Sequence, residues 1–571
     1  MSLLDQASLV LVPSAIKTGE VLVQKPLPTK FSDETGNYDG NDPQGSANLT
    51  FTRNSNATRV NADGLVEKVR TNELVYSQDF TQTAWTSFST ATLSSTTTVT
   101  PAGTTDAVRL TATGAVQDLR TVRTITNGVT YTNSAYVRRV SGTGIINILD
   151  VNGTTSNIAV TSEWQRFSVT STATSTTGRL YIRIQTSGDV IEVWGCQMEA
   201  SDFGPTQYIP TTSAAVSVGP TANVPRLDYS GGCSRLILEP QRTNLLYSSE
   251  ALTSTDWTKY GGQTITGNDA ISPDGYQNAD KMVDAGGVFQ QRAFSPSTAY
   301  ALSVFIKKDT ATSFRLGFVD YQSGGYFGGD IRYTFATGAI TVTQSLNSSV
   351  SGEAVDYGNG WIRLICKFTT NASQNYNYQF AEYDGGTGWS WGYQLEAGSY
   401  ATSLISTQSA SVTRLADSAS RTNIANLIGQ TEGTLFAEFE IDADNTNGYN
   451  RVLAVSDGTA NNRIFIFAQN TEVFRFYVAN GGAAQVDIVS STSILGGRHK
   501  VAFAYKANDF IAYVDGVQVG SDTSGTVPAC PNVYVGTSES GSTQPLEGGI
   551  NQALLFKTRL PNATLANLTA L

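Results

Sequence analysis

Alternating apolar and polar residues run through most of the chain and predict β-strands. In YALSVFIKK, residues 300–308, apolar residues occupy both faces near the middle of the run, as expected for a strand packed on both sides. In WSWGYQLE, residues 389–396, the aromatic residues fall on one face, and Gln394 and Glu396 fall on the other. Clusters of Gly, Asn and Ser follow such runs at hairpin spacing, so the pattern predicts antiparallel β-sandwiches.

Four blocks of sequence occur twice in the same order, which indicates a duplicated domain. The first copies begin TNELVYSQDF (Thr71), YTNSAYVRRV (Tyr131), EWQRFSVT (Glu163) and VWGCQMEA (Val193), and the second copies begin TNLLYSSEAL (Thr243), YALSVFIKKD (Tyr300), GWIRLICKFT (Gly360) and WGYQLEAG (Trp391). The separation between matching blocks is larger at the last two blocks than at the first two, so we expect the second copy to carry insertions in its later half.

The two ends of the chain differ from this repeated middle. From about Ser411 a third series of strands begins, including GTLFAEFEIDAD and NRIFIFAQN. Its clearest local feature is Asp515-Gly516 between two apolar runs, which predicts a type I′ hairpin turn. Residues 1–47 contain prolines and a tail rich in Gly, Asn and Asp, which predicts an extended arm rather than a packed domain.

The sequence therefore predicts an all-β protein of tandem antiparallel β-sandwich domains behind an extended N-terminal arm. We assign residues 1–47 to the arm, 48–75 to a connector, 76–217 to the first sandwich, 218–242 to a linker, 243–411 to the second sandwich and 412–571 to a C-terminal sandwich. At roughly 100–200 residues per domain, the chain is long enough for each of these sandwiches to bury its own core.

Charge and cysteine usage exclude several function classes. Lys+Arg 37 against Asp+Glu 48 gives a formal net charge of −11, which argues against nucleic-acid binding because phosphate contacts need a surplus of cations. Four cysteines, Cys196, Cys233, Cys366 and Cys530, form no CxxC pair, so we expect free thiols and neither a zinc nor a redox motif. The sequence has no basic leader and no apolar run of about 18 residues, so we expect no export signal and no membrane insertion.

Several of these stretches resemble a known group of proteins. NVPRLDYSGGCSRLILEPQRTNLLYSSEALTSTDW, from Asn223, with WGYQLEAGSYATSLIST and TRLAD, resembles tailed-bacteriophage virion proteins in which carbohydrate-binding-module-like jelly rolls are strung along fibres. FTRNSNATRVNADGLVEKVRTNEL is similar to the segment that precedes such modules, and GGINQALLFKTRLPNATLANL resembles the concanavalin-A/laminin-G-like sandwich. The resemblance covers residues 220–420 and, more loosely, 50–218. It indicates the type of module more reliably than it indicates any particular ligand.

The resemblance implies a structural subunit of a bacteriophage tail or head fibre or appendage, assembled in the host bacterial cytoplasm and located in the virion. Residues 1–47 would dock on other virion proteins, and a homotrimer is the usual arrangement of such fibres. The distal modules would adhere to host-surface polysaccharide through weak, multivalent sites. Two alternatives stay open here: a virion-associated glycan hydrolase, and a purely structural capsid or tail decoration.

Candidate catalytic residues are few, and we expect that the protein is not an enzyme. His499 is the sole histidine, and its place at a strand start suits a structural role. The hydrolase alternative would use Glu440 and Asp442, but Asn445 stands where the second glutamate of sandwich-type glucanases is expected. Same-face neighbours along a strand lie about 6.6 Å apart, against about 5–5.5 Å for a retaining pair. An exposed, solvated strand face is the better interpretation.

Two further sets of polar residues have both structural and functional interpretations. In DADNTNG, Asp442, Asp444 and Asn447 could hold Ca²⁺, or the segment could be a plain polar hairpin; no other cofactor is expected. Glu199 and Glu396 hold equivalent places in the two copies. A carboxylate there can accept backbone N–H groups of the following loop and fix the chain's exit, with sugar hydrogen bonding as the alternative.

Glycan recognition needs an exposed aromatic face beside planar polar groups. Most tryptophans occur as matched pairs in the two copies, which favours core packing over ligand contact. The better candidates lie in two tyrosine-rich insertions of the second copy, and they are Tyr321, Tyr326, Tyr376, Tyr378, Tyr383 and Asp384. These residues could equally cap a core or contact a neighbouring chain.

Overall fold

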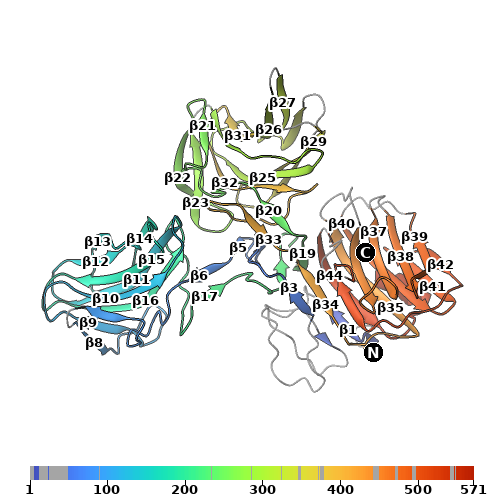
Figure 1. Cartoon of the computed structure of the whole chain (residues 1–571), viewed down its shortest axis with the longest axis horizontal. Coiled ribbons are helices and arrows are strands. Elements are labelled where there is room, and N and C mark those ends of the chain that lie inside the picture. The colour runs from blue at the N-terminus through green and yellow to red at the C-terminus, as the bar shows by residue number, and fades with distance from the viewer. Residues whose placement is uncertain are drawn as a thin grey trace. The chain divides into compact units, whose positions relative to one another are not determined.

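Figure 1 shows the structure of the chain, a computed structural model. It describes residues 6–11, 23–24, 49–88, 91–232, 234–283, 286–322, 325–344, 349–370, 372, 378–441, 449–469, 473–491, 497–539, 546 and 548–571. Antiparallel strands dominate these residues, and α2 (Asn562–Thr569) is a short helix, so the predicted all-β fold is confirmed. Contacts divide the chain into two compact units, one made of residues 68–219 and 266–280, and the other of residues 1–67, 220–265 and 281–571.

The first jelly roll is a sandwich of two five-stranded sheets. One sheet has the order β13 (Thr155–Ile158), β12 (Ile146–Leu149), β15 (Thr177–Ile184), β10 (Gln117–Thr124) and β7 (Thr86–Phe88). The other has the order β14 (Gln165–Thr172), β11 (Thr130–Ser141), β16 (Val190–Ala200), β9 (Val108–Thr111) and β8 (Thr92–Ser95). Alternate apolar residues such as Leu119, Ile148 and Ile182 are fully buried between the sheets and form the core.

The second jelly roll repeats this arrangement with two six-stranded sheets. One sheet has the order β21 (Thr258–Tyr260), β24 (Gly286–Gln291), β31 (Tyr378–Asp384), β26 (Ser313–Gln322), β27 (Gly325–Thr334) and β28 (Ala339–Gln344). The other has the order β22 (Thr264–Ile271), β23 (Gln277–Val283), β32 (Gly388–Ala397), β25 (Ala299–Lys308), β30 (Trp361–Thr369) and β29 (Ser349–Asp356). Strands β28 and β29 add one strand to each sheet, in the half of the domain where the sequence predicts insertions.

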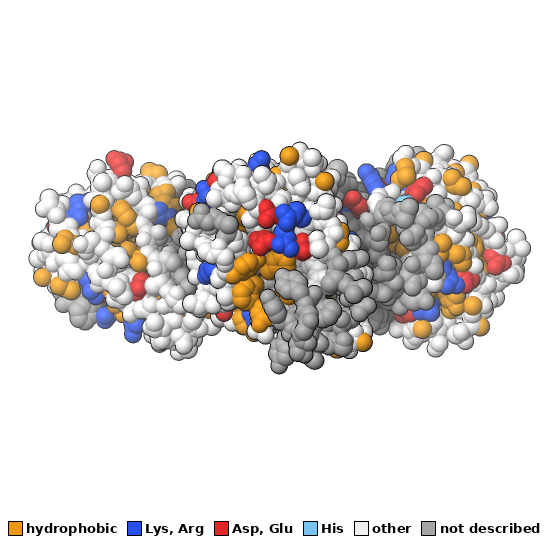
Figure 2. Space-filling view, turned by 90° about the horizontal axis from the view of Figure 1, so that it is seen from above, with side chains coloured by type: hydrophobic (Ala, Val, Ile, Leu, Met, Phe, Trp, Pro, Cys, Tyr) orange, Lys and Arg blue, Asp and Glu red, His pale blue; other side chains and the backbone are white. Residues whose placement is uncertain are grey.

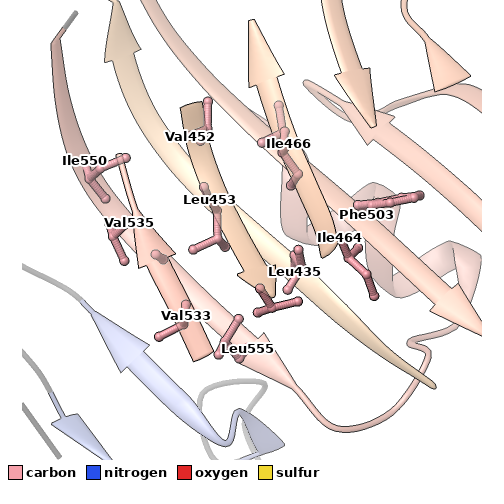
Figure 3. Close-up of a cluster of buried hydrophobic side chains, with 14 of the residues drawn as sticks. Leu435, Val452, Leu453, Ile464, Ile466, Phe503, Val533, Val535, Ile550 and Leu555 are labelled. Carbon is pink, nitrogen blue, oxygen red and sulfur yellow. The ribbon is translucent and has the colours of Figure 1, made fainter. Parts of the chain in front are cut away.

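The C-terminal sandwich pairs a nine-stranded sheet with a seven-stranded sheet. The first contains β18 (Arg226–Asp228), β19 (Arg235–Leu238), β44 (Gly548–Phe556), β35 (Glu432–Ile441), β40 (Gly497–Lys506), β41 (Asp509–Val514) and β42 (Val517–Asp522), with β1 (Leu9–Leu11) and β2 (Val23–Gln24) attached to it. The second contains β3 (Thr50–Thr52), β34 (Ser418–Arg421), β43 (Asn532–Val535), β36 (Tyr449–Ser456), β37 (Arg463–Gln469), β38 (Val473–Asn480) and β39 (Ala483–Val489). Branched aliphatic side chains from both sheets meet between them, as Figure 3 shows for Leu435, Val452 and Ile466.

Short strands from earlier in the chain complete this last sandwich. β1 pairs with β44, β3 pairs with β34, and β19 also pairs with β44. The sequence pattern placed these segments in the arm, the connector and the linker. A strand of three or four residues contains only one or two repeats of the alternating pattern. That is too short to predict the sheet to which the strand belongs, so only the folded structure assigns it.

Three two-stranded ribbons lie at the ends of the domains. They are β4 (Thr58–Val60) with β5 (Val66–Lys68), β6 (Arg70–Asn72) with β17 (Val216–Val218), and β20 (Arg242–Asn244) with β33 (Val412–Arg414). The last two ribbons are equivalent, because β6 and β20 both read Arg-Thr-Asn and both close a jelly roll.

One turn and two β-bulges follow directly from local sequence. Asp515 and Gly516 have φ values of 47° and 82°, so the predicted type I′ turn between β41 and β42 is confirmed. Gly195 and Gly392, the glycines that follow tryptophan in the two copies, lie at β-bulges where the register of the strand pair shifts. Their φ values of 60° and 68° are ones that glycine adopts without steric cost, which explains why both copies use glycine there.

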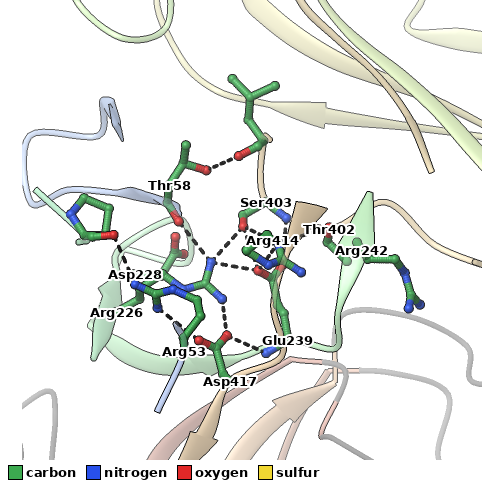
Figure 4. Close-up of polar contacts among 12 residues, drawn as sticks. Arg53, Thr58, Arg226, Asp228, Glu239, Arg242, Thr402, Ser403, Arg414 and Asp417 are labelled. Atoms are coloured by element: carbon green, nitrogen blue, oxygen red, sulfur yellow. Dashed lines mark hydrogen bonds and ion pairs between the residues drawn. The ribbon is translucent and has the colours of Figure 1, made fainter. Parts of the chain in front are cut away.

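A buried network of ion pairs lies in the unit made of residues 1–67, 220–265 and 281–571 (Figure 4). Asp417 pairs with Arg53 at 3.0 Å and also with Arg226, and Glu239 pairs with Arg226 at 2.8 Å and with Arg414 at 2.7 Å. The three guanidinium groups are at most 1% exposed. They come from the residue after β3, from β18 and from β33, so the network ties three separate segments of the chain to one another.

Acid should weaken this network. Burial alone would raise the pKa of the Glu239 carboxyl, but Arg414, Arg226 and hydrogen bonds from Ser403 hold that pKa well below its usual value. The stabilisation by Glu239 is therefore complete above the unfolded-state pKa of about 4.3 and is lost as the pH falls below it, towards the depressed folded pKa.

We expect the Glu239→Gln variant to be less stable than wild type at pH 7 but to lose less further stability between about pH 5 and pH 3. Urea unfolding midpoints measured across that range check this expectation. Parallel curves for the two proteins would show that Glu239 does not titrate with folding.

Candidate functional site

The repeated glutamates are anchors inside the two jelly rolls. Glu396 accepts hydrogen bonds from the backbone N–H and the hydroxyl of Thr402, both at 2.7 Å. Glu199 accepts the same pair of bonds from Thr206, with the backbone N–H at 2.8 Å. Both carboxylates are buried, at 0% and 1% exposure. The predicted role, fixing the chain where it leaves the last strand, is confirmed.

A second repeated anchor was not singled out from the sequence. Asn244 donates to the carbonyls of Tyr393 and Ile405, while its own oxygen accepts from Leu246 and Leu395. Asn72 makes the equivalent four bonds in the first jelly roll. The sequence did contain a sign of this anchor, because the same Thr-Asn pair begins both copies of the first repeated block.

Replacing Glu396 by glutamine should destabilise the second jelly roll by about 2–3 kcal/mol, because a neutral amide accepts hydrogen bonds less strongly and turns an N–H towards buried donors. Glu199→Gln is the matched change and should affect the first jelly roll instead. Hydrogen exchange followed by mass spectrometry assigns each effect to its domain. Equal protection of the second jelly roll in Glu396→Gln and wild type would contradict the anchoring role.

The paired tryptophans mainly pack the cores. Trp85 and Trp257 are 4% and 3% exposed, and each indole N–H donates to a backbone carbonyl. Trp194 and Trp391 are 3% and 0% exposed. Trp164 is half-buried and donates to the carbonyl of Val99 at 2.9 Å. These indoles are therefore held by the scaffold.

One sheet of the second jelly roll carries aromatic and charged side chains on its outward face. β26 pairs with β27 and β31 without a register shift, so Arg315 lies opposite Arg332 on one side and opposite Glu382 on the other. Phe314 and Leu316, the neighbours of Arg315 in sequence, point the other way into the core. We call the outward surface the polar–aromatic face and define it by Tyr260, Phe289, Arg315, Asp330, Arg332, Tyr378, Phe380, Glu382 and Asp384.

Aromatic rings line one part of the polar–aromatic face. Phe289 lies between Tyr378, with ring centroids 5.2 Å apart, and Tyr260, at 6.0 Å. All three residues are half-buried. The Phe380 ring lies below the Arg315 guanidinium, whose central carbon is 5.4 Å from the ring centroid. Rings held at a surface in this way offer apolar faces to a ligand.

Charged side chains lie beside these rings. Arg315 makes two bonds to Asp330, at 3.1 and 3.0 Å, and a further one to Glu382. The bonds to Asp330 and the attraction of both carboxylates keep the pKa of Arg315 above its usual value, against the opposing effect of burial. The Tyr260 hydroxyl donates to Glu382 at 2.7 Å, and Arg332 pairs with Asp384. Figure 2 shows acidic and basic side chains gathered beside hydrophobic ones in the middle of the view.

The structure brings two of the predicted glycan-binding residues, Tyr378 and Asp384, to this face. Tyr321 and Tyr326 are backbone partners in β26 and β27. Tyr383 lies on the opposite side, 2% exposed, and its hydroxyl donates to the carbonyls of Lys307 and Trp389. Its ring therefore packs in the core. Tyr376 lies outside the described residues.

Sequence reasoning missed the members of the face that come from other strands. Tyr260, Phe289 and Arg315 lie on β21, β24 and β26, far from the tyrosine-rich insertions in sequence. Only strand pairing makes them neighbours, and no local motif specifies that pairing. The available signal was alternation in β26, where Arg315 interrupts a run of apolar residues.

The metal candidates and one of the two hydrolase candidates cannot be placed. Asp442, Asp444 and Asn447 lie outside the described residues, and within the described ranges no cluster of His, Cys, Asp or Glu is arranged to hold a metal. His499 bonds Asp515 at 2.8 Å and packs against Phe474. Glu440 pairs with Arg235 at 3.3 Å. Both side chains are therefore held by contacts within the C-terminal sandwich.

Cys196, Cys366 and Cys530 are buried free thiols, and Cys233 lies outside the described residues. Burial raises the pKa of all three described thiols, which keeps them protonated and unreactive.

In the part of the chain that the structure describes, no helix has the length and apolar character needed to span a bilayer.

Comparison with known proteins identifies the class of the C-terminal domain. Residues 416–566 match the family model described as the Concanavalin A-like lectin/glucanases superfamily, which confirms the predicted concanavalin-A/laminin-G-like sandwich. No curated protein matches the chain.

Three solved structures are similar to parts of the chain. The CBM40 of the Ruminococcus gnavus IT-sialidase has 14% identity over 26% of this chain and 86% of that chain, with a TM-score of 0.23. The NanB sialidase from Streptococcus pneumoniae has 16% identity over 26% of each chain, with a TM-score of 0.23. The CBM22-1-CBM22-2 tandem domain of Paenibacillus barcinonensis Xyn10C has 12% identity over 57% of this chain and 98% of that chain, with a TM-score of 0.20.

Proposed function

We propose that the protein is a non-catalytic adhesin that binds glycans through the polar–aromatic face of the second jelly roll. The observation that carries this proposal is the row of half-buried rings, Tyr260, Phe289 and Tyr378, held beside the ion-paired Arg315 and Glu382. The C–H surface of a pyranose stacks on such rings, while its hydroxyls bond to fixed charged groups. All three rings are half-buried, which limits the entropy lost on binding.

The charge of the face favours neutral sugars. Arg315 and Arg332 are its two cations, and both are paired with its three carboxylates, Asp330, Glu382 and Asp384. A sialic or uronic acid would bring another carboxylate to a face whose cations are already neutralised, and that costs binding energy. We therefore propose a neutral hexose polymer as the ligand.

The setting of this activity is proposed from the sequence resemblance. The chain would be a fibre or appendage subunit of a bacteriophage virion, would dock on other virion proteins through residues 1–47 and would act as a homotrimer on host-surface polysaccharide. A contact with a Kd near 1 mM provides only about −4.1 kcal/mol. Linked copies can raise overall affinity by about 10²–10⁴, so a multivalent particle would make weak sites sufficient.

A glycan array tests this proposal. The full chain, labelled and applied to neutral, sialylated and uronic-acid glycans, should bind neutral hexose polymers, and Phe289→Ala should weaken that binding. Selective binding to acidic glycans would overturn the neutral class. Binding to no glycan and to no bacterial cells would favour the purely structural decoration instead.

Hydrolysis is not part of the proposal. Glu438 and Glu440, the two acidic residues near the end of β35, pair with Arg498 and Arg235. We expect no release of reducing ends from bound polysaccharide, and Glu440→Gln should leave binding unchanged. Reducing-end release that disappears in Glu440→Gln would establish the hydrolase alternative.

A further inference from the structure

The counterpart sheet of the first jelly roll carries a different polar cluster on its outward face. Asp118 and Arg120 of β10 lie opposite Arg183 and Tyr181 of β15, and Asn147 of β12 also lies opposite Arg183. Leu119, between Asp118 and Arg120, points into the core. We call this cluster the amide–carboxylate patch and define it by Asp118, Arg120, Asn147, Asn157, Tyr181, Arg183 and Gln185.

The patch contains buried polar groups on the outward side of a sheet. Asp118 and Asn147 are both 0% exposed. One carboxylate oxygen of Asp118 accepts two bonds from Arg183, at 3.2 and 3.0 Å, but the other oxygen, Oδ1, has no hydrogen-bond partner. A buried carboxylate oxygen without a hydrogen bond is costly, and such groups in folded proteins call for an explanation.

Amide groups extend the patch next to Asp118. Gln185 donates to Asn147 at 2.6 Å, and Asn147 donates to the exposed Asn157 at 2.6 Å. The side chains are therefore fixed as an ordered row of amides along the sheet. Such planar groups are suited to pairing with sugar hydroxyls.

Arg120 covers both the unbonded oxygen and the one aromatic ring of the patch. Its Nε lies 3.9 Å from Asp118 Oδ1, and its guanidinium carbon lies 5.7 Å from the centroid of the half-buried Tyr181 ring. The Arg120 side chain itself is 32% exposed. Its Nε also donates to the Thr86 hydroxyl at a long 3.4 Å. At this exposure the long ion pair, the long hydrogen bond and the ring contact each stabilise an arginine only weakly, so a ligand can displace the side chain at modest cost.

The two jelly rolls share this chemistry without sharing its positions. In the first, the central arginine comes from β15 and its carboxylate from β10, whereas in the second the arginine comes from β26 and its carboxylates from β27 and β31. The topology makes β15 the counterpart of β31, not of β26. By contrast, the structural anchors Asn72 and Asn244 keep equivalent places. Inheritance of the scaffold therefore explains the anchors but not the two charged faces.

We infer that the amide–carboxylate patch is a second glycan-binding site, and this inference rests on the proposed function. A sugar ring takes the place of the Arg120 guanidinium over Tyr181, and one of its hydroxyls donates to Asp118 Oδ1. Neighbouring hydroxyls bond to the amides of Asn157 and Gln185. The ligand class is again a neutral, hydroxyl-rich glycan, because Arg183 is already paired with Asp118. Each chain then carries two sites.

Saturation-transfer NMR on the full chain tests the second site, because it detects binding with Kd values in the millimolar range. The probes are neutral glucose, galactose and mannose oligosaccharides, and the background is Phe289→Ala/Tyr378→Ala, which removes the rings of the second jelly roll. Signal should persist in this background. It should disappear on adding Tyr181→Ala and grow about two- to fivefold on adding Arg120→Ala, which uncovers the ring.

The outcomes separate the two claims. Loss of all signal in the Phe289→Ala/Tyr378→Ala background, with wild type binding, overturns the second site and leaves the proposed function standing. No signal from wild type overturns both. If signal persists in this background but is unchanged by Tyr181→Ala, or decreases with Arg120→Ala, the remaining binding occurs at another site. Either result overturns the inference. Circular dichroism and urea midpoints of each variant confirm that the first jelly roll is folded.

Discussion

Asp417→Ala is expected to destabilise the unit that contains the C-terminal sandwich by about 3–5 kcal/mol. Asp417 binds Arg53 and Arg226, both fully buried, and also accepts the backbone N–H of Glu239 at 2.9 Å. Alanine would leave two buried guanidinium groups with less compensation for their lost hydration. Removing one member of a buried network costs far more than breaking an exposed pair, because the remaining charges stay buried.

Urea unfolding followed by tyrosine fluorescence and by hydrogen exchange of the C-terminal strands measures this effect. Asp487→Ala is the matched control, since Asp487 pairs with Arg475 on the same sandwich but is 37% exposed, and it should cost less than about 1 kcal/mol. If Asp417→Ala is no more destabilising than Asp487→Ala, the network does not hold the segments together.

Phe289→Ala/Tyr378→Ala is expected to weaken binding of a neutral oligosaccharide to the second jelly roll about 30-fold or more, or about 2 kcal/mol. Phe289 is the middle ring of the row and Tyr378 its closer neighbour, so the double change removes most of the apolar surface on which a sugar can stack. The Arg315 bonds to Asp330 and Glu382 do not depend on these two rings and should persist. The loss of affinity should therefore come from the missing rings, with the charged groups of the face still in place.

Isothermal titration in the Tyr181→Ala background isolates this site from the first jelly roll. Tyr477→Ala is a suitable control, because Tyr477 is a half-buried tyrosine of the C-terminal sandwich, packed against Phe465. It should leave the affinity unchanged. An unchanged affinity in Phe289→Ala/Tyr378→Ala, with a folded second jelly roll, would move the glycan site away from the polar–aromatic face.

Much of the scaffold could be predicted from the sequence because it rests on local rules. A short run that is apolar on both faces identified β25, and the Asp515-Gly516 pair identified a turn that needs positive φ at both residues. Comparison of the two copies indicated that Glu199 and Glu396 are anchors. Each of these features is specified by residues that are neighbours in sequence or that occur twice.

The candidate site depended on information that local sequence does not hold. Tyr378 and Tyr383 lie five residues apart on β31, and only the parity of that strand puts one ring outward and the other in the core. The members of the face on other strands come from β21, β24, β26 and β27, so strand order had to be known first. The same holds for Asp118 and Arg183, which are 65 residues apart and meet through strand pairing.

The most direct test of the account is a crystal structure of the full chain with a bound neutral oligosaccharide from the array. We predict a sugar ring stacked on Phe289 and Tyr378, with hydroxyls bonded to Arg315, Glu382 or Asp384. An oligosaccharide bound only to the C-terminal sandwich, with the polar–aromatic face empty, would contradict the central claim.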